Sequence, residues 1–444
     1  MKNTATPPLS AGKEWTPERV GRCATQIFLY CFLAYTCSYV GRKNFNACLP
    51  AMIEDGLLVK SFGGLVTTAF MLAYGAGQFI NGILGSKIRP KFMIGIGLCG
   101  AGICNLSMGF ATTPYILPVI WALNGLFNSM LWAPIIRVFT DLLPAERRTR
   151  DGTNLAASCS VGAILAYLIP SVILDLAGWR AVFYVSGGIL LSAFLMWVIG
   201  NRALSSYTKM MEEACRIERS SLREAALAKE NTPRKKSSRS LFPVVIASGL
   251  WLAIFGLICN GALRDAVESW APTMLSEKFQ LSSSMASLIS VIIPVISISG
   301  TYVANWLHEK FIRNELYTAC IMFGVAALCV GGLFLFRSGS SVVSAVFMAV
   351  SVSAMWGANH MFLTLIPYHF APLNLSAAVT GLLNSIIYFA TAACSFLYGV
   401  LSDLAGWDAL TLVWLCIGVC GALFSALGGV VWAKKRILLD EGRL

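Results

Sequence analysis

Long apolar segments separated by short polar ones recur from one end of the sequence to the other. Each apolar segment reaches about 18 residues or more, which lets a helix cross a bilayer core of roughly 30 Å. We therefore predict an all-α polytopic membrane protein with twelve transmembrane helices. Their predicted limits are 23–50, 62–84, 91–111, 114–139, 152–174, 179–200, 241–274, 282–306, 315–336, 341–366, 375–401 and 408–433.

The composition agrees with this pattern, because 57% of the residues are hydrophobic and only 13% are charged. The polar start of the chain lacks the apolar core of a signal peptide. The 14 cysteines are scattered, mostly within apolar segments, without the spacing of zinc ligands. No nucleophile–base set stands out either. We expect no enzyme activity, no catalytic residues, no metal site and no cofactor.

The net charge of +12 has a better explanation than nucleic-acid binding. If the segments between the predicted helices alternate sides, 26 of the 34 lysines and arginines fall on one side and four on the other. Positive residues accumulate on the cytoplasmic side of membrane proteins. We therefore predict cytoplasmic termini in a multi-pass protein of the cell (inner or plasma) membrane, with the lipid bilayer as partner and no nucleic acid.

The chain also contains an internal repeat. LDLAGW at 174–179 returns as SDLAGW at 402–407, each between the fifth and sixth helix of its set. This repeat predicts two six-helix halves, with a substrate site at their interface near the middle of the membrane. The predicted parts are a cytoplasmic tail (1–22), the first half (23–200), a basic cytoplasmic linker (201–240), the second half (241–433) and a second cytoplasmic tail (434–444).

Each half carries an arginine in its first helix. Arg42 and Arg264 are 222 residues apart, and Tyr35, Tyr39 and Arg42 share one helical face. A charged side chain deep in a membrane segment is costly, so it usually faces a cavity or a partner. A guanidinium matches phosphate oxygens in a bidentate way, and two of them suit a phosphate group. Alternatively, Arg42 marks the outer end of its helix, reaching with Lys43 to the lipid headgroups.

Other predicted helices carry polar or aromatic pairs one turn apart. Taken alone, each pair is typical of a hydrogen bond between helices. Several such pairs together with two arginines indicate a shared aqueous cavity. The candidate lining residues from these pairs are Tyr74 and Gln78, Asn128 and Trp132, and Asn384 and Tyr388.

Two acidic residues follow the second arginine. Asp265 is its neighbour, and Glu268 lies four residues after it, where a helix brings two side chains together. Pairing within this helix would neutralise Arg264 and remove the net positive charge. Alternatively, Glu268 pairs with Lys43 across the two halves and forms a gate on the outer side.

At these residues the sequence resembles the organophosphate:inorganic phosphate antiporter family of the major facilitator superfamily, typified by glycerol-3-phosphate and hexose-phosphate transporters. The resemblance covers nearly the whole chain. It is carried by Y-x3-Y-x2-RKNF at 35–45, LR followed by W-x-PT at 263–273, AYG at 73–75, N-x3-W-x-P-x2-R at 128–137 and the 381–388 stretch before DLAGW.

The resemblance implies that Arg42 and Arg264 bind the phosphate group. It also implies a pocket lined by Tyr35, Tyr39, Tyr74, Asn128, Trp132 and Tyr388. Gln78 stands where well-known members carry a lysine.

We accordingly expect a monomeric secondary transporter that exchanges a small organic phosphate, such as glycerol 3-phosphate or a sugar phosphate, for inorganic phosphate by rocker-switch alternating access. One alternative is proton-coupled symport of an organic anion such as a hexuronate, for which Asp265, Glu268 and His360 are the available titratable groups. Another is a transporter-like sensor of sugar phosphate, because such a sensor exists within the family.

Overall fold

The computed structural model describes residues 16–84, 88–213, 241–336, 339–373 and 375–440. The regular secondary structure in these ranges is all helical, with short turns and irregular segments between the helices and no β-strand. The N-terminal helices are α1 (Pro17–Glu54), α2 (Lys60–Leu84), α3 (Pro90–Phe110), η1 (Pro114–Ile116), α4 (Leu117–Asn128), α5 (Trp132–Leu142) and α6 (Ala145–Ala203). The C-terminal helices are α8 (Leu241–Ala247), α9 (Leu250–Phe279), α10 (Ser283–Ser290), α11 (Ile292–Leu307), η2 (His308–Ile312), α12 (Glu315–Leu335), α13 (Ser341–His360), η3 (Met361–Leu365), α14 (Ile366–Tyr368), η4 (Ala371–Leu373) and α15 (Ser376–Asp440).

Nine helical segments of the described chain are long and apolar enough to cross a membrane. Two of them, Arg150–Ala203 and Ala378–Leu439, are interrupted by non-helical glycines at Gly178 and Gly406. The prediction of an all-α membrane protein with several apolar spans is confirmed.

The helix ends differ from the predicted limits. α1 begins at Pro17 rather than at residue 23, because Thr16 caps the helix by accepting the Arg19 N–H at 3.3 Å and proline fits a first helical position. α15 continues to Asp440, so the predicted tail 434–444 begins inside a helix. Residues 1–15 of the predicted N-terminal tail, 214–240 of the predicted linker and 441–444 lie outside the described residues.

Three predicted helices are interrupted near proline or glycine, and one of them, 282–306, is divided at Val291 between α10 and α11, close to Pro294. The predicted helix 114–139 is divided at residues 129–131 into α4 and α5, because Pro134 lacks the N–H that would bond to the carbonyl of Met130. Gly249 separates α8 from α9 with a φ of +76°, a left-handed conformation that glycine adopts without strain.

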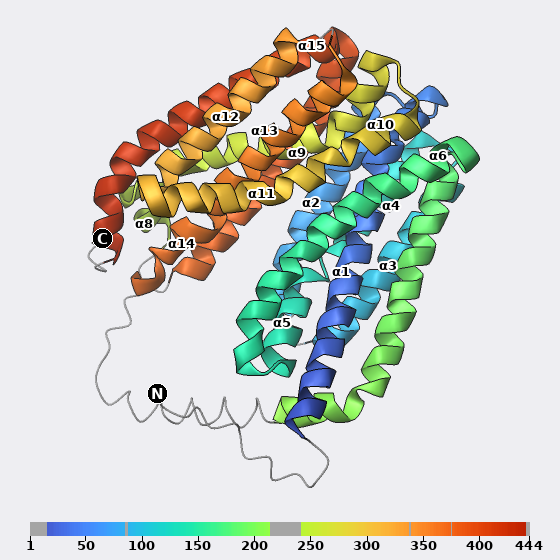
Figure 1. The fold of residues 1–444 in the computed structure, drawn as a ribbon, viewed down its shortest axis with the longest axis vertical. Helices are drawn as coiled ribbons and strands as arrows, with labels where there is room; N and C mark the ends of the chain where they lie inside the picture. Colours follow the sequence, from blue (N-terminus) through green and yellow to red (C-terminus); the bar gives the residue numbers. More distant parts are fainter. Residues whose placement is uncertain (1–15, 85–87, 214–240, 337–338, 374, 441–444) are drawn as a thin grey trace.

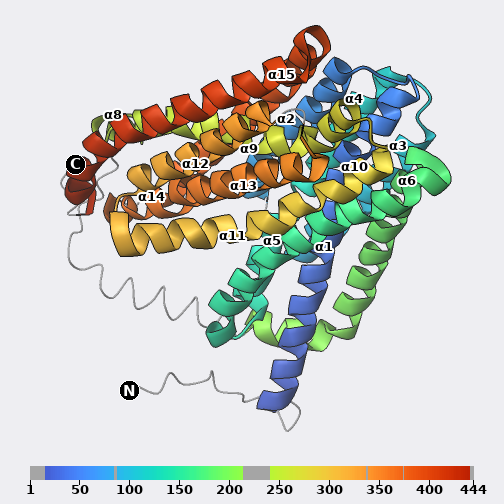
Figure 2. The same ribbon diagram turned by 45° about the horizontal axis from the view of Figure 1, so that its top comes forward.

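The N-terminal and C-terminal helices form two groups in space (Figures 1 and 2). They meet where α1 contacts α9, α2 contacts α15 and α6 contacts α10. A buried apolar cluster continues across this contact and includes Phe45 and Phe70 from the first group and Leu263 and Leu383 from the second.

The sequence repeat has the same local structure in both groups. Gly178 and Gly406 have φ values of +72° and +75°, and both are followed by a tryptophan. Trp179 Nε1 donates to Asp55 Oδ2 at 2.7 Å, and Trp407 Nε1 donates to Glu277 Oε2 at 2.8 Å. Each acid lies at or near the end of the first long helix of its group. The two copies of the sequence repeat therefore also share the same tryptophan-to-carboxylate hydrogen bond.

At this end of the molecule the two groups are tied together by the clasp, which we define as Lys60, Ser61, Glu277, Asp403 and Trp407. Lys60 Nζ lies 2.9 Å from Glu277 Oε2 and 3.8 Å from Asp403 Oδ1. The Ser61 N–H donates to Asp403 Oδ2 at 2.7 Å. α2 is thereby joined to both α9 and α15.

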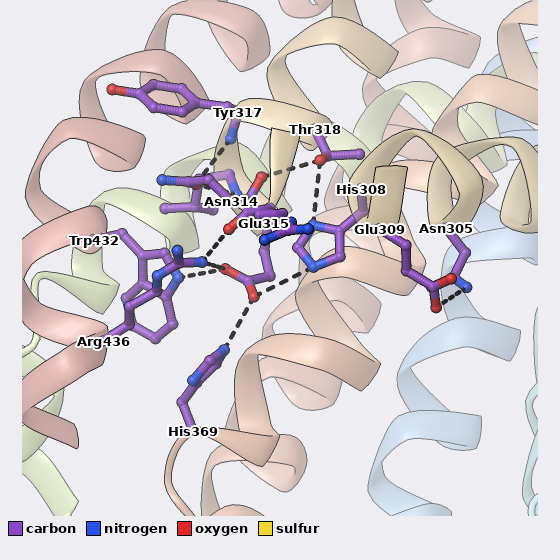
Figure 3. A network of polar contacts seen from close by, with 12 residues as sticks. Asn305, His308, Glu309, Asn314, Glu315, Tyr317, Thr318, His369, Trp432 and Arg436 are labelled. Atoms are coloured by element: carbon purple, nitrogen blue, oxygen red, sulfur yellow. Dashed lines mark hydrogen bonds and ion pairs between the residues drawn. The ribbon is translucent and has the colours of Figure 1, made fainter. Parts of the chain in front are cut away.

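The other end of the C-terminal helices holds a separate polar network around the buried Glu315 (Figure 3). Its carboxylate accepts from Trp432 Nε1 at 2.8 Å, and lies 3.0 Å from His369 Nε2 and 3.5 Å from Arg436 Nη1. The labelled partners all belong to the C-terminal helices and their connections. This network, roughly 40 Å from the clasp along α15, stabilises one group and does not join the two.

Candidate functional site

Arg42 lies among aromatic rings in the C-terminal half of α1. Its guanidinium carbon is 4.7 Å from the ring centroid of Tyr39, 4.7 Å from that of Tyr74 and 5.6 Å from that of Phe70. Each distance is within the range of a cation–π interaction. Among the described residues, no carboxylate forms an ion pair with Arg42. We call Tyr39, Phe70 and Tyr74 the aromatic cage.

Three more of the predicted aromatic residues adjoin the cage. Tyr35 packs on Tyr39 and Trp132 with ring centroids 5.4 and 5.0 Å apart. Tyr74 contacts Tyr388 of α15 at 5.3 Å, with the rings edge to face. The group therefore draws on α1, α2, α5 and α15, and it reaches from the N-terminal helices to the C-terminal ones.

Arg264 has different surroundings. Its side chain is buried, with the guanidinium carbon 4.5 Å from the ring centroid of Trp356. Asp265 binds it in a bidentate way, with Nη2–Oδ2 at 2.8 Å and Nε–Oδ1 at 3.2 Å. Thr391 Oγ1 donates to the same Asp265 Oδ2 at 2.9 Å. Arg264 is thus a neutralised cation in this structure.

The pairing within the helix that one sequence-based alternative described is present: Arg264 is neutralised, and its partner is the adjacent Asp265 rather than Glu268. Glu268 Oε1 lies 2.8 Å from Lys43 Nζ, the contact that the other alternative anticipated. Both side chains of this pair are buried, and Tyr167 donates its hydroxyl to the Glu268 carbonyl at 2.9 Å.

The Lys43–Glu268 pair fixes the relation between the two arginines. Lys43 directly follows Arg42, and Glu268 lies one helical turn beyond Arg264. An ion pair of 2.8 Å between them therefore holds the two arginine-bearing stretches of α1 and α9 side by side. Counted over Arg42, Lys43, Arg264, Asp265 and Glu268, the formal charge is +1.

The predicted polar residues fall into two classes. Gln78 donates to the hydroxyl of Tyr74 at 2.9 Å, which places it beside the aromatic cage. Asn128 instead donates to Asn124, whose own amide donates to the Gly41 carbonyl, so it belongs to a buried amide network behind α1. Asn384 is partly buried one turn before Tyr388.

Sequence reasoning missed Phe70, Trp356 and Thr391. Phe70 and Trp356 lie in apolar helices where an aromatic residue is unremarkable, and only the position of a cation beside them gives them a polar role. Thr391 lies 126 residues from Asp265. No local sequence signal connects such a pair.

A pocket of about 250 Å³ lies beside the site, between α2 and α15. It is lined by Gly75 and Tyr388 and by apolar side chains that include the exposed Phe79 and Phe389. Because these phenylalanines face outward, this pocket opens on the apolar surface of the molecule and does not contain the arginines.

Comparison with known proteins identifies this arrangement. Residues 31–393 match the Major Facilitator Superfamily. The chain belongs to this superfamily. Its members are transporters rather than enzymes, and the expectation that the protein is not an enzyme is confirmed on that ground.

Several relatives within the superfamily are named for the transport of phosphorylated compounds. The chain is 23% identical to a probable hexose phosphate transport protein of Chlamydia pneumoniae over 90% of both chains. It is 25% identical to the glycerol-3-phosphate transporter of Bacillus subtilis over 91% of this chain and 92% of that one. It is 28% identical to the membrane sensor protein UhpC of Escherichia coli over 78% of both. The resemblance to this family of transporters is confirmed, at low identity.

Solved structures agree on the fold. A D-xylose–proton symporter superposes with a TM-score of 0.68 at 16% identity, covering 90% of this chain and 97% of that one. A bacterial homologue of the human lysosomal transporter Spinster gives a TM-score of 0.68 at 15% identity, covering 95% and 98%. These likenesses show the major facilitator fold.

Proposed function

We propose that this protein is a secondary transporter that exchanges a small organic phosphate, such as glycerol 3-phosphate or a sugar phosphate, for inorganic phosphate. The observation that carries the proposal is the pair of arginines on α1 and α9, held side by side by the Lys43–Glu268 contact. Arg42 supplies a partly buried cation that no carboxylate of the described residues neutralises. Guanidinium groups are well suited to phosphate oxygens.

The fold supports an alternating-access mechanism. We propose twelve membrane spans in two six-helix halves, joined by a basic linker at 201–240, with cytoplasmic termini in the plasma membrane and a monomer as the working unit. The clasp closes the halves against each other at the end away from the termini, and the Lys43–Glu268 pair joins them deeper in the molecule. By the positive-inside rule this is the outer end, and on that orientation the proposal assigns this arrangement to an inward-facing state.

The charge of the site supports exchange. A cation buried without a partner is costly, so an empty carrier resists closing around Arg42. A bound phosphate group removes that cost and allows the halves to rock. Transport in either direction then requires an anion in the site, and one anion is exchanged for another.

The test is uptake of radiolabelled phosphate by proteoliposomes that contain the purified protein. Uptake is expected into vesicles loaded with phosphate and not into empty ones, and unlabelled glycerol 3-phosphate or sugar phosphates should compete. Equal uptake by loaded and empty vesicles would exclude obligate exchange. Uptake of a hexuronate driven by a pH gradient, without phosphate exchange, would support proton-coupled symport instead.

A second candidate function is sensing, and the similarity to the membrane sensor protein UhpC favours it. A sensor would bind a sugar phosphate and signal to a partner without moving bulk substrate. Phosphate-dependent thermal stabilisation of the purified protein, together with no exchange in the same proteoliposomes, would distinguish it from a transporter.

A further inference from the structure

Asp265 occupies the position at which an anion would meet Arg264. Its two oxygens take the Nε and Nη2 protons, which form the bidentate edge of the guanidinium. Thr391 holds one of these oxygens from α15. Arg264 and Asp265 are 7% and 8% exposed, and Thr391 is 3% exposed. The contact is therefore a buried and oriented ion pair rather than a passing surface contact.

A phosphate group that binds Arg264 encounters the negative charge of the Asp265 carboxylate. It either displaces Asp265 from the guanidinium or binds the remaining N–H groups with a negative charge close by. Both routes cost more for a doubly charged phosphate than for a singly charged one, because repulsion grows with charge and is poorly screened in a buried site. Arg42 alone remains to offset the second charge.

We propose that Asp265 is a specificity-determining residue that competes with the phosphoryl group for Arg264, so that the site favours a singly charged phosphate over a dianion. The substrate class is then a phosphodiester or the monoprotonated form of a phosphomonoester. This inference rests on the proposed phosphate site and goes beyond it by assigning the charge of the bound group.

Two small probes separate these charge states. Methyl phosphate becomes a dianion as the pH rises through about 6, like other phosphomonoesters. Dimethyl phosphate keeps a single charge throughout. Binding is measured as the shift in thermal unfolding of the purified full chain with increasing probe at pH 5.0 and pH 7.5, because a ligand stabilises the folded state according to its affinity.

The wild-type chain should bind methyl phosphate more tightly at pH 5.0 than at pH 7.5. At pH 7.5 it should prefer dimethyl phosphate. Asp265→Asn should reverse this preference and tighten methyl phosphate binding at pH 7.5 by about tenfold or more, which is the scale of coupling between close charged groups. Without probe this variant should unfold at a lower temperature, because Arg264 is then buried unpaired.

Glu268→Gln is the matched control, since it removes the same charge one turn away but does not touch Arg264. Because Asp265 still occupies the bidentate edge of Arg264 in this variant, its effect on the preference between the two probes should be clearly smaller than that of Asp265→Asn. Equal effects of the two substitutions would mean that general charge, not competition for Arg264, sets the preference, and would overturn the proposal.

Thr391→Val provides a second variant in case Asp265→Asn fails to fold. It keeps every charge and removes only the hydroxyl that holds Asp265 Oδ2. A smaller change in the same direction as Asp265→Asn is expected. Unchanged methyl phosphate binding in both variants would overturn the role of Asp265 while leaving the phosphate site intact. No binding of any phosphate by the wild-type chain would overturn the proposed function itself.

Discussion

Arg42 and Arg264 occupy equivalent places in the internal repeat, yet their neighbours have opposite charges. Lys43 follows Arg42, and Asp265 follows Arg264. The position of Glu268 corresponds to Asn46 in the first copy. The first copy therefore carries two positive charges at its centre and the second copy a net negative one. Because of this difference, Lys43 of the first copy forms an ion pair with Glu268 of the second. The residues that differ between the copies therefore also hold the two copies together.

The comparison shows that Arg42 keeps its positive charge for a bound anion, whereas the charge of Arg264 is already paired with Asp265. Arg42 is surrounded by rings, which stabilise a cation without cancelling its charge. Arg264 is cancelled by a carboxylate. Substitutions that treat the two residues alike test whether this difference governs function.

The largest effect is expected for Arg42→Lys. A lysine keeps the charge but loses the planar set of donors, so the initial rate of phosphate exchange in proteoliposomes should fall by about 100-fold or more. Arg180→Lys is a suitable control, since Arg180 also lies over an aromatic ring, 4.2 Å from the ring centroid of Trp179, but is not part of the site. Normal exchange in Arg42→Lys would remove Arg42 from the site.

The next effect concerns stability. Arg264→Ala leaves the buried Asp265 without its partner and should lower the free energy of unfolding by about 3–5 kcal/mol. The double variant Arg264→Ala/Asp265→Asn should recover most of that loss, although phosphate exchange should stay absent. Thermal unfolding of the three proteins measures the difference. If the double variant is as unstable as the single one, the loss of stability does not come from an unpaired charge on Asp265. That result would contradict the view that Asp265 neutralises Arg264.

A smaller effect is expected for Glu268→Gln, which removes the attraction between the two copies. The contact between α1 and α9 should weaken, and the clasp end should open more often. Hydrogen–deuterium exchange at residues 54–62 and 402–408 should become several-fold faster. This is the change expected when an ion pair that contributes about 1–2 kcal/mol to the closed state is lost. Asp141→Asn, which affects an ion pair within α5, provides the control and should leave these segments unchanged.

The smallest effect is expected for Phe70→Leu. This change removes one ring from the aromatic cage and leaves Tyr39 and Tyr74 in place. A cation–π contact contributes about 0.5–1 kcal/mol at an accessible site, so phosphate affinity should fall about two- to fivefold. Affinity from thermal shifts measures this loss. A loss as large as that of Arg42→Lys would mean that Phe70 shapes the site itself rather than supporting the cation.

Much of the arrangement around Arg42 could be predicted from the sequence, because helical spacing alone places Tyr35, Tyr39 and Arg42 on one face. The cost of a charge in a membrane segment then indicates that this face is polar. The grouping of Tyr74 and Tyr388 near it was inferred from similar pairs in other helices. Their contact, with ring centroids 5.3 Å apart, agrees with that grouping.

The partner of Arg264 could not be predicted in the same way. Asp265 is the direct neighbour and Glu268 has the spacing of one helical turn, so the sequence left the choice between the two acids open. The partner is Asp265 because Lys43 from another helix binds Glu268, and Thr391 from a third helix orients Asp265. The clasp was also missed, since Lys60 and Glu277 lie 217 residues apart and only tertiary packing brings them together.

The two glycines at which α6 and α15 reverse direction have a consequence for how the chain is made. Gly178 and Gly406 combine a positive φ with a ψ near 180°, a backbone conformation that is essentially restricted to glycine. Nothing lies within 4 Å of a side chain added at either position, so the restriction comes from the backbone alone. Each hairpin must make its turn with almost no loop as it emerges from the ribosome and enters the bilayer. Alanine at either glycine would therefore reduce the yield of inserted protein while leaving the turnover of each correctly inserted molecule unchanged.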